Sequence, residues 1–394
     1  MLNRRSFLRL TGTGLAYAGV AGALTASGAA FASAPTDNRF VFVFLRGGLD
    51  GLHALVPWAD ADYHRLRPQL GAPLRPSEGG AIDLNGYFGL HQDLSALMPL
   101  WQSGELSFIP AATTRYRDRS HFDGQNLLEN GTGRPNGARD GWLNRAIVEL
   151  NGGDRRLGLS LGPSVPLILQ GPAPVQAWSN EQLPDLDEDF LQRLAVVYRH
   201  DPAFQSALAA AMGTPEPDMS ADAPTRDNFV IAARAAADIL AAPEGPRIGV
   251  LEMSGWDTHY GQPGRLPRLF QRLSEGLLAL REGLGQDWSR TVVMVASEFG
   301  RTAAENGSQG TDHGTGGLAM LAGGAVRGGQ IAGDWPGLSA AALFEDRDLR
   351  AVNAYESVFK TILIQHLGLD AGFAERVVFP ESQSLAPFEG ILRA

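Results

Sequence analysis

The chain has 394 residues, of which 33 are Lys or Arg and 43 are Asp or Glu, so its net charge near pH 7 is −10. An acidic chain is a poor candidate for binding nucleic acid or an anionic membrane surface. The absence of cysteine excludes disulfides, thiol nucleophiles and metal sites built from thiolates.

The first 34 residues are typical of a cleavable export signal, with an Arg4-Arg5 pair, a Gly/Ala-rich apolar stretch and small residues up to Ala34. The arginine pair followed by Phe-Leu resembles the twin-arginine type, so we expect the twin-arginine export machinery as a partner and a periplasmic or secreted location. The alternative is a membrane anchor, but five glycines make the stretch weakly apolar for a span of roughly 20 residues. No later segment is apolar enough to span a bilayer, so we expect no stable span after cleavage. Removal of the signal, with three arginines and no acid, shifts the net charge from −10 to −13.

The first predicted strand covers residues 40–45, where aromatic, β-branched and leucine side chains follow one another without interruption. Gly47 and Gly48 come directly after it and allow a sharp turn. Asp50 therefore lies at the end of this strand. It is the first of several polar side chains that the sequence places at strand ends.

A helix is predicted around residues 94–101 and a strand near 106–109. A second, amphipathic helix opens around 119–123 and stops at Gly131. Ser120 therefore lies at or near a helix N-terminus, where amide hydrogens and the helix dipole favour an anion.

The middle of the chain is less regular. Residues 161–174 hold four prolines and predict short strands and loops, whereas 187–211 and 226–241 predict helices. Residues 154–245 could therefore form a helical insertion or cap within a single domain spanning 35–394. A Gly-x-Ser-x-Gly string occurs at 158–162, but a nucleophile elbow needs a strand before it and a helix after it, and prolines follow here.

The C-terminal half reads as strand, crossover helix and strand. Residues 248–253 and 291–296 are apolar runs, and between them leucines and a phenylalanine recur every three or four residues up to Leu284. Strands that alternate with helices favour an α/β fold with a mostly parallel central sheet and helices on both faces. Ligands bind at the carboxyl ends of such strands.

Acids, a serine and histidines gather at these strand ends and helix starts. Taken singly, an Asp after a strand is more often a turn residue and a lone His more often a satisfied polar group. Taken together they predict one pocket, and ligands without thiolate suit Zn, Mn, Mg or Ca. The set is Asp50, Ser120, Asp257, His259, Glu298 and His313.

The ordered motifs resemble those of a bacterial, twin-arginine-exported family still labelled as a domain of unknown function, which is similar in turn to the alkaline phosphatase and sulfatase superfamily. The motifs are Phe-Leu-Arg-Gly-Gly-Leu-Asp-Gly-Leu at 44–52, Ser-His-Phe-Asp at 120–123, Trp-Asp-Thr-His at 256–259, Ser-Glu-Phe-Gly-Arg-Thr at 297–302 and Thr-Asp-His-Gly at 311–314. The resemblance implies an alkaline-phosphatase-like fold with one or two divalent metal ions at the carboxyl edge of the sheet.

The resemblance also assigns roles to residues. Ser120 takes the place of the nucleophile and Asp50 that of the acid after the first strand. Asp257 and His259 match one metal site, which His313 completes, and Glu298 matches an acid of a second site.

The sequence departs from the superfamily at Phe299, where an imidazole ligand is usual. Either His121 or His53 compensates, or the second metal is absent. Asp312 is the reserve ligand beside His313.

These residues lead to the expectation of a metal-dependent hydrolase of small anionic phosphate or sulfate esters, with Arg46 or Arg301 steadying the anion. Two alternatives stay open at this point. One is a non-catalytic binding or scaffold protein on the same fold. The other is a metal-independent serine hydrolase that uses Ser120.

Overall fold

The computed structural model describes residues 36–71, 80–150, 156–180 and 228–393. The predicted export signal and the predicted helix at 187–211 lie outside these residues, as does much of the predicted insertion at 154–245. None of the helices in the described ranges is both long and apolar enough to cross a bilayer.

Within the described ranges the main sheet has nine strands, in the order β11-β5-β10-β9-β1-β8-β6-β7, with β12 pairing with β5. Their bounds are β1 (Arg39–Arg46), β5 (Leu106–Thr113), β6 (Gly158–Leu161), β7 (Val175–Trp178), β8 (Ile248–Ser254), β9 (Thr291–Ser297), β10 (Gly317–Ala322), β11 (Gln330–Ile331) and β12 (Asn353–Ala354). A small antiparallel sheet joins β2 (Leu55–Val56), β4 (Gly89–Leu90) and β3 (Ile82–Asp83).

One strand of the described main sheet, β10, runs against all the others. It pairs antiparallel with β5 and β9, whereas the other pairs in this sheet are parallel. The start of β10 therefore lies at the same edge as the carboxyl ends of its neighbours. Residues that precede β10 meet residues that follow β1, β8 and β9.

The sheet is buried on both faces, as alternation along β1 shows. Val41, Val43 and Leu45 belong to one hydrophobic cluster, while Phe40, Phe42 and Phe44 belong to another. A strand that is covered on both sides needs this continuous apolar run, because successive side chains point to opposite faces.

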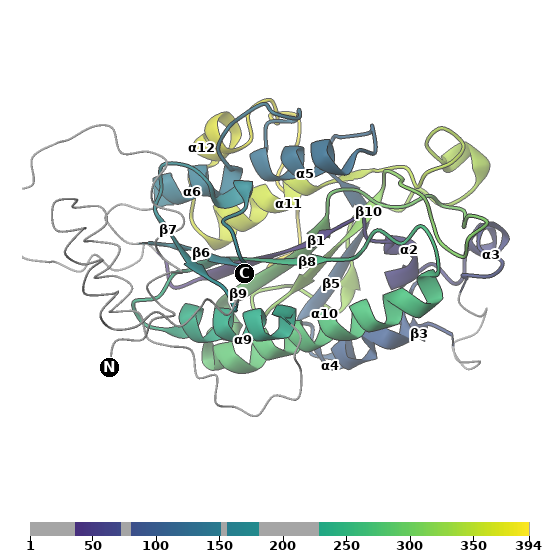
Figure 1. Ribbon diagram of the computed structural model, residues 1–394, viewed down its shortest axis with the longest axis horizontal. Coiled ribbons are helices and arrows are strands. Elements are labelled where there is room, and N and C mark those ends of the chain that lie inside the picture. The colour runs from purple at the N-terminus through teal and green to yellow at the C-terminus, as the bar shows by residue number, and fades with distance from the viewer. Residues whose placement is uncertain (1–35, 72–79, 151–155, 181–227, 394) are drawn as a thin grey trace, which may run out of the picture.

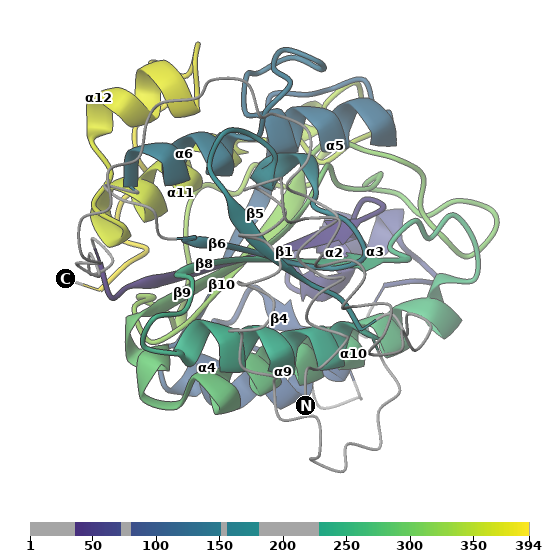
Figure 2. The ribbon, with the colours of Figure 1, turned by 60° about the vertical axis from the view of Figure 1, so that its left-hand side comes forward.

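Helices cover both faces (Figures 1 and 2). One layer holds the 3-10 turns η2 (Gln92–Leu97) and η5 (Gly285–Arg290) with α4 (Met98–Gln102), α9 (Asn228–Ala241) and α10 (Gln262–Leu284). The other holds α5 (His121–Asn130), α6 (Trp142–Leu150), α11 (Tyr355–Thr361), α12 (Ala371–Phe373) and the π-helical turns η7 (Ile362–His366) and η8 (Ala374–Val378). Short elements complete the list: α2 (Gly51–Ala54), α3 (Ala61–Leu66), η3 (Leu167–Leu169) and η6 (Ala340–Ala342).

The predicted α/β fold with a mostly parallel sheet and helices on both faces is confirmed. The predicted crossover helix is α10, between the parallel strands β8 and β9 that flank β1. Ser160 of the Gly-x-Ser-x-Gly string lies buried inside β6. It is therefore not a nucleophile elbow, as its surroundings in the sequence indicate.

Candidate functional site

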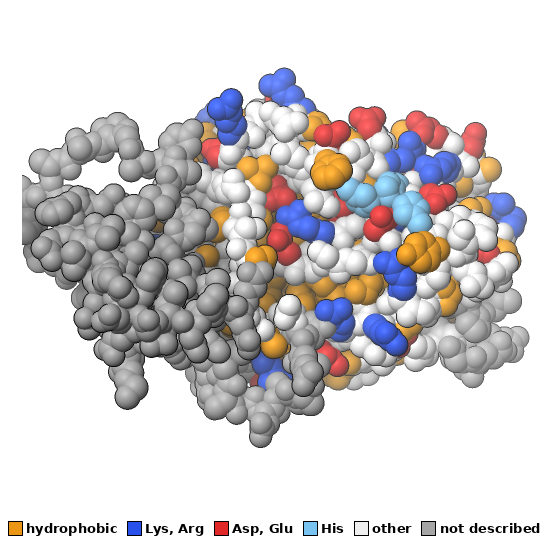
Figure 3. Space-filling view, viewed as in Figure 1, with side chains coloured by type: hydrophobic (Ala, Val, Ile, Leu, Met, Phe, Trp, Pro, Cys, Tyr) orange, Lys and Arg blue, Asp and Glu red, His pale blue; other side chains and the backbone are white. Residues whose placement is uncertain are grey.

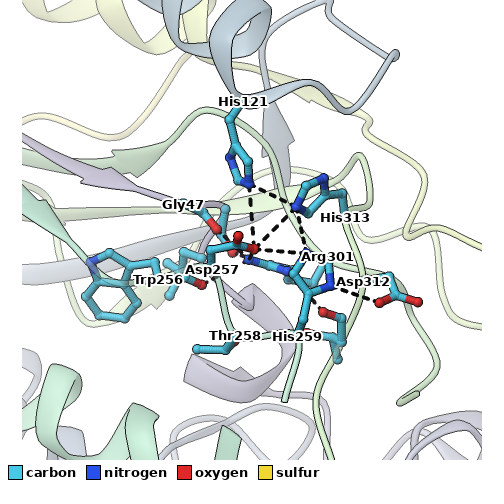
Figure 4. A network of polar contacts seen from close by, with 12 residues as sticks. Gly47, His121, Trp256, Asp257, Thr258, His259, Arg301, Asp312 and His313 are labelled. Carbon is cyan, nitrogen blue, oxygen red and sulfur yellow. Dashed lines mark hydrogen bonds and ion pairs between the residues drawn. The ribbon is translucent and has the colours of Figure 1, made fainter. Parts of the chain in front are cut away.

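Three imidazole rings meet at the carboxyl edge of the main sheet (Figure 4). His121 is the first residue of α5, His259 follows β8, and His313 precedes β10. The Nε2 atom of His313 lies 2.9 Å from the Nε2 atom of His121 and 2.9 Å from that of His259. The rings are partly exposed, and Figure 3 shows histidine side chains at the surface with charged and hydrophobic side chains around them.

Asp257 supplies an oxygen to the same point. Its Oδ1 lies 3.1 Å from Nε2 of His259, 3.3 Å from that of His313 and 3.6 Å from that of His121. A tetrahedral metal with bonds of about 2.0–2.1 Å would space its ligand atoms about 3.3 Å apart. The oxygen of Asp257 with the nitrogens of His121 and His313 forms a group whose atoms all lie within 4.8 Å of one another, the spacing of a metal ligand set, and Nε2 of His259 adjoins two of these atoms.

The Nδ1 atom of each histidine faces an oxygen. His121 contacts Oε1 of Glu298 at 2.7 Å, His259 contacts Oδ1 of Asp312 at 3.0 Å, and His313 contacts the backbone carbonyl of Arg119 at 3.0 Å. Each Nδ1 therefore has an acceptor for its hydrogen, and a histidine that donates through Nδ1 presents Nε2 to a cation as a lone pair. The Nε2 atoms of all three rings lie within 3.6 Å of Oδ1 of Asp257.

The two carboxylates in this arrangement are held in their charged form. Burial alone would raise the pKa of Glu298, but the hydrogen bonds from His121 and Gln125 lower it below its usual value. The hydrogen bond from His259 lowers the pKa of Asp312. Oxygens that accept from Nδ1 fix the ring orientation and tautomer of metal-binding histidines.

The glycine turn after β1 brings these groups together. Gly47 has a φ of +122°, and a Cβ there would lie 2.5 Å from the backbone nitrogen of Asp257. Its amide donates to Glu298 at 2.9 Å, and its carbonyl accepts from Arg301 at 2.5 Å. A side chain at this position would push apart the segments after β1 and β8.

Glu298 was expected as a ligand in a second metal site, and in the structure its oxygens contact protein donors. It is fully buried, and Oε1 accepts hydrogen bonds from Gly47, His121 and Gln125. Oε2 accepts from the Ser297 hydroxyl at 2.9 Å. Because its oxygens are used in this way, Glu298 positions His121.

Asp50 was expected in the same pocket, and the structure shows its carboxylate in contact with other side chains. It is buried at the N-cap of α2, and its Oδ2 accepts from Arg67 at 2.7 Å and from Gln262 at 2.7 Å. Burial alone would raise the pKa of Asp50, but the charge of Arg67 lowers it. The carboxylate thus neutralises a buried guanidinium instead of joining the histidines. The spacing of residues in the sequence did not indicate that Arg67 would contact Asp50.

The two arginines expected to steady an anion are engaged with the protein itself. Arg46 contacts Glu129, Glu252 and Gln125. The buried guanidinium of Arg301 donates to backbone carbonyls, among them that of Thr311 at 3.0 Å, and to Oδ1 of Asp257 at 2.5 Å. Burial alone would raise the pKa of Asp257, but this contact lowers it.

Ser120 is the N-cap of α5 and the residue directly before His121. Its hydroxyl accepts from the amide of Asp123 at 3.5 Å, and its own amide donates to the Tyr116 hydroxyl at 3.1 Å. Ser120 therefore lies at the helix start predicted for it. His53, the other reserve, is buried and stacks on His91 with ring centroids 4.7 Å apart.

The structure places both reserve residues, His121 and Asp312, at the histidine cluster. The signal for His121 was its place directly after a helix N-cap, which aims the first side chain of α5 at the strand ends. Asp312 acts through Nδ1 of His259, a contact across 53 positions that no local pattern shows.

One comparison with known protein families gives a match over most of the chain. Residues 91–376 match a family model described as a protein of unknown function, DUF1501. No curated protein matches the sequence.

Three solved structures illustrate what the chain is similar to. Ps i-CgsB in complex with k-i-k-neocarrahexaose is 11% identical, with 90% of this chain and 75% of that chain covered and a TM-score of 0.41. The lipoteichoic acid synthase LtaP from Listeria monocytogenes is 10% identical, with 90% and 77% covered and a TM-score of 0.39. Alkaline phosphatase from the Antarctic bacterium TAB5 is 12% identical, with 72% and 90% covered and a TM-score of 0.32. The family match spans most of the sequence, and the chain belongs to the DUF1501 family.

Proposed function

We propose that this protein is an exported, metal-dependent hydrolase of small phosphate or sulfate esters, in which His121, His259, His313 and Asp257 hold one divalent ion. The observation that carries the proposal is that Oδ1 of Asp257 lies within 3.6 Å of the Nε2 atoms of three histidines, each of which faces another oxygen through Nδ1. Lone pairs 2.9 Å apart repel each other unless a cation or a proton lies between them.

The donor set favours Zn²⁺ or Mn²⁺ over Mg²⁺ and Ca²⁺, because hard cations prefer all-oxygen sites. A bound metal would polarise the ester and lower the pKa of an oxygen nucleophile. The neutralising contact of Arg301 with Asp257 leaves the site with a smaller negative charge. A smaller charge makes the approach of an anionic ester less costly.

Ser120 is the proposed nucleophile, because it stands at the N-terminus of α5 beside His121. Its Oγ would form a bond to phosphorus or sulfur while the bond to the alcohol breaks, with the serine proton ending on the departing alcohol. Water would then cleave the seryl ester and restore the hydroxyl. Free amides at a helix start favour the anion that is held during this exchange.

A second candidate is a metal-binding protein without turnover. The engagement of Arg46 with Glu129 and Glu252 favours it, because a guanidinium held by two carboxylates is not free to bind an ester. The two candidates share the metal site and differ in whether any ester is cleaved.

The test is hydrolysis of an aryl phosphate, an aryl phosphodiester and an aryl sulfate by protein loaded with Zn, Mn, Mg or Ca. Ser120→Ala should abolish turnover and keep the metal, whereas His313→Ala should lose both. The control is Ser289→Ala, an exposed serine just before β9 at the opposite edge of the sheet. Undiminished turnover by Ser120→Ala would exclude the covalent route, and no turnover by any metal-loaded form would favour the second candidate.

A further inference from the structure

Two exposed aromatic side chains stand beside the outer histidines of the cluster. Among the described residues five large hydrophobic side chains are exposed, and the aromatic ones are Phe122, at 89%, and Tyr260, at 66%. Phe122 directly follows His121, and Tyr260 directly follows His259. Isolated exposed hydrophobic residues are common, but here both exposed rings adjoin the candidate site.

The order of the histidines places the two rings on different sides of the site. Nε2 of His313 lies between the Nε2 atoms of His121 and His259, at 2.9 Å from each. Phe122 belongs to α5 and Tyr260 to the segment between β8 and α10, so they reach the cluster from separate elements. A ligand held at the histidines would have one ring on each flank.

Tyr260 also carries a positive neighbour. The guanidinium carbon of Arg265 lies 5.3 Å from the centroid of the Tyr260 ring, a cation–π distance. Arg265 covers part of this ring and brings a positive charge to the edge of the site. A ligand that combines a ring with a negative charge matches both features.

We infer that Phe122 and Tyr260 bind the alcohol part of the substrate, and that this part carries a ring with an apolar face, either aryl or pyranosyl. The inference rests on the proposed function and narrows its substrate class. Stacking of a ring on an aromatic side chain contributes about two- to tenfold in affinity. Esters of open-chain alcohols lack this contribution.

The test measures binding, so its outcome does not depend on turnover. Dissociation constants of zinc-loaded protein are compared by calorimetry for phenylphosphonate and methylphosphonate, and for benzenesulfonate and methanesulfonate. Phe122→Ala and Tyr260→Ala should each weaken the ring-bearing member of a pair about two- to tenfold and leave the methyl compound unchanged. Tyr260→Phe should keep the wild-type ratio, as should Val148→Ala, an exposed residue of α6. A C-glucosyl phosphonate in place of phenylphosphonate distinguishes a pyranose ring from an aryl ring.

Equal affinities for ring-bearing and methyl compounds in the wild type would overturn the inference, even if the protein hydrolyses esters. The inference also fails if both alanine variants keep the wild-type affinity ratios, and a smaller sedimentation coefficient of those variants would then assign the two rings to contacts between copies of the chain. A preference for the ring-bearing probes that both alanine variants lose would uphold the inference, even if no ester is cleaved.

Discussion

Replacing Glu298 by Gln should weaken metal binding while keeping the shape of the side chain. In the native protein Glu298 Oε1 lies 2.7 Å from Nδ1 of His121, inside a fully buried pocket. The substituted amide has one acceptor oxygen, and its N–H groups would face the amide of Gly47, which is itself a donor. The hydrogen on Nδ1 of His121 then loses its charged acceptor, so that Nε2 is held less firmly as a lone pair.

The expected loss follows from this geometry. Changing an acceptor that orients a metal-bound histidine costs about 10- to 100-fold in metal affinity, or about 1.4–2.7 kcal/mol. Asp312 plays the same part for His259, but its side chain is 50% exposed and its contact is longer, at 3.0 Å. Water screens such a contact, so Asp312→Asn should cost less than Glu298→Gln.

The assay is zinc titration of dialysed protein by calorimetry, at a pH where all variants are folded. Glu252→Gln is the matched control, since Glu252 is a carboxylate of β8 that pairs with Arg46 instead of a histidine. Wild-type zinc affinity in Glu298→Gln would refute the reasoning from the histidine tautomers. Equal losses in Glu298→Gln and Asp312→Asn would refute the role given to burial.

Three further predictions concern other parts of the chain. Asp50→Ala should destabilise the fold by about 3–5 kcal/mol in urea unfolding, because it leaves the Arg67 guanidinium buried without this carboxylate. The zinc stoichiometry of this variant should equal that of the wild type, and loss of the metal would show that Asp50 is a ligand. Burial lowers the pKa of His53 from 6.5 to about 3, so the unfolded chain binds a proton there that the folded chain does not. Stability should fall by about 1.4 kcal/mol for each pH unit of acidification between these values, and unfolding of His53→Gln should show a shallower pH dependence than the wild type. Replacing Arg4 and Arg5 by Lys should leave the precursor in the cytoplasm on cell fractionation, and normal periplasmic accumulation would contradict a twin-arginine signal.

The sequence predicted the layers because their signals are local. The apolar run in β1 and the three-and-four spacing in α10 each report how one element is buried. The position of His259 after β8 followed from the same logic, since carboxyl ends of parallel strands share an edge. His313 reached that edge for a different reason, because β10 is antiparallel and begins there.

What the sequence could not predict depends on contacts between distant residues. Asp50 contacts Arg67 instead of the histidines. Glu298 contacts Nδ1 of His121, a residue 177 positions earlier in the chain. Both are buried carboxylates, and a buried carboxylate binds whichever donors the fold brings within reach. Whether such a carboxylate binds a metal or positions another side chain therefore depends on which residues pack around it at the edge of the sheet.

The most direct test of the proposed metal site is the zinc content of the dialysed protein after loading, measured by mass spectrometry on wild type, His313→Ala and His64→Ala. His64 contacts the carbonyl of Trp58 and serves as the control histidine. If the three imidazoles and Asp257 form one site, wild type and His64→Ala should hold about one zinc ion per chain, and His313→Ala should hold essentially none. Wild-type protein without bound zinc, or His313→Ala with the full complement, would contradict a single site built from these four residues.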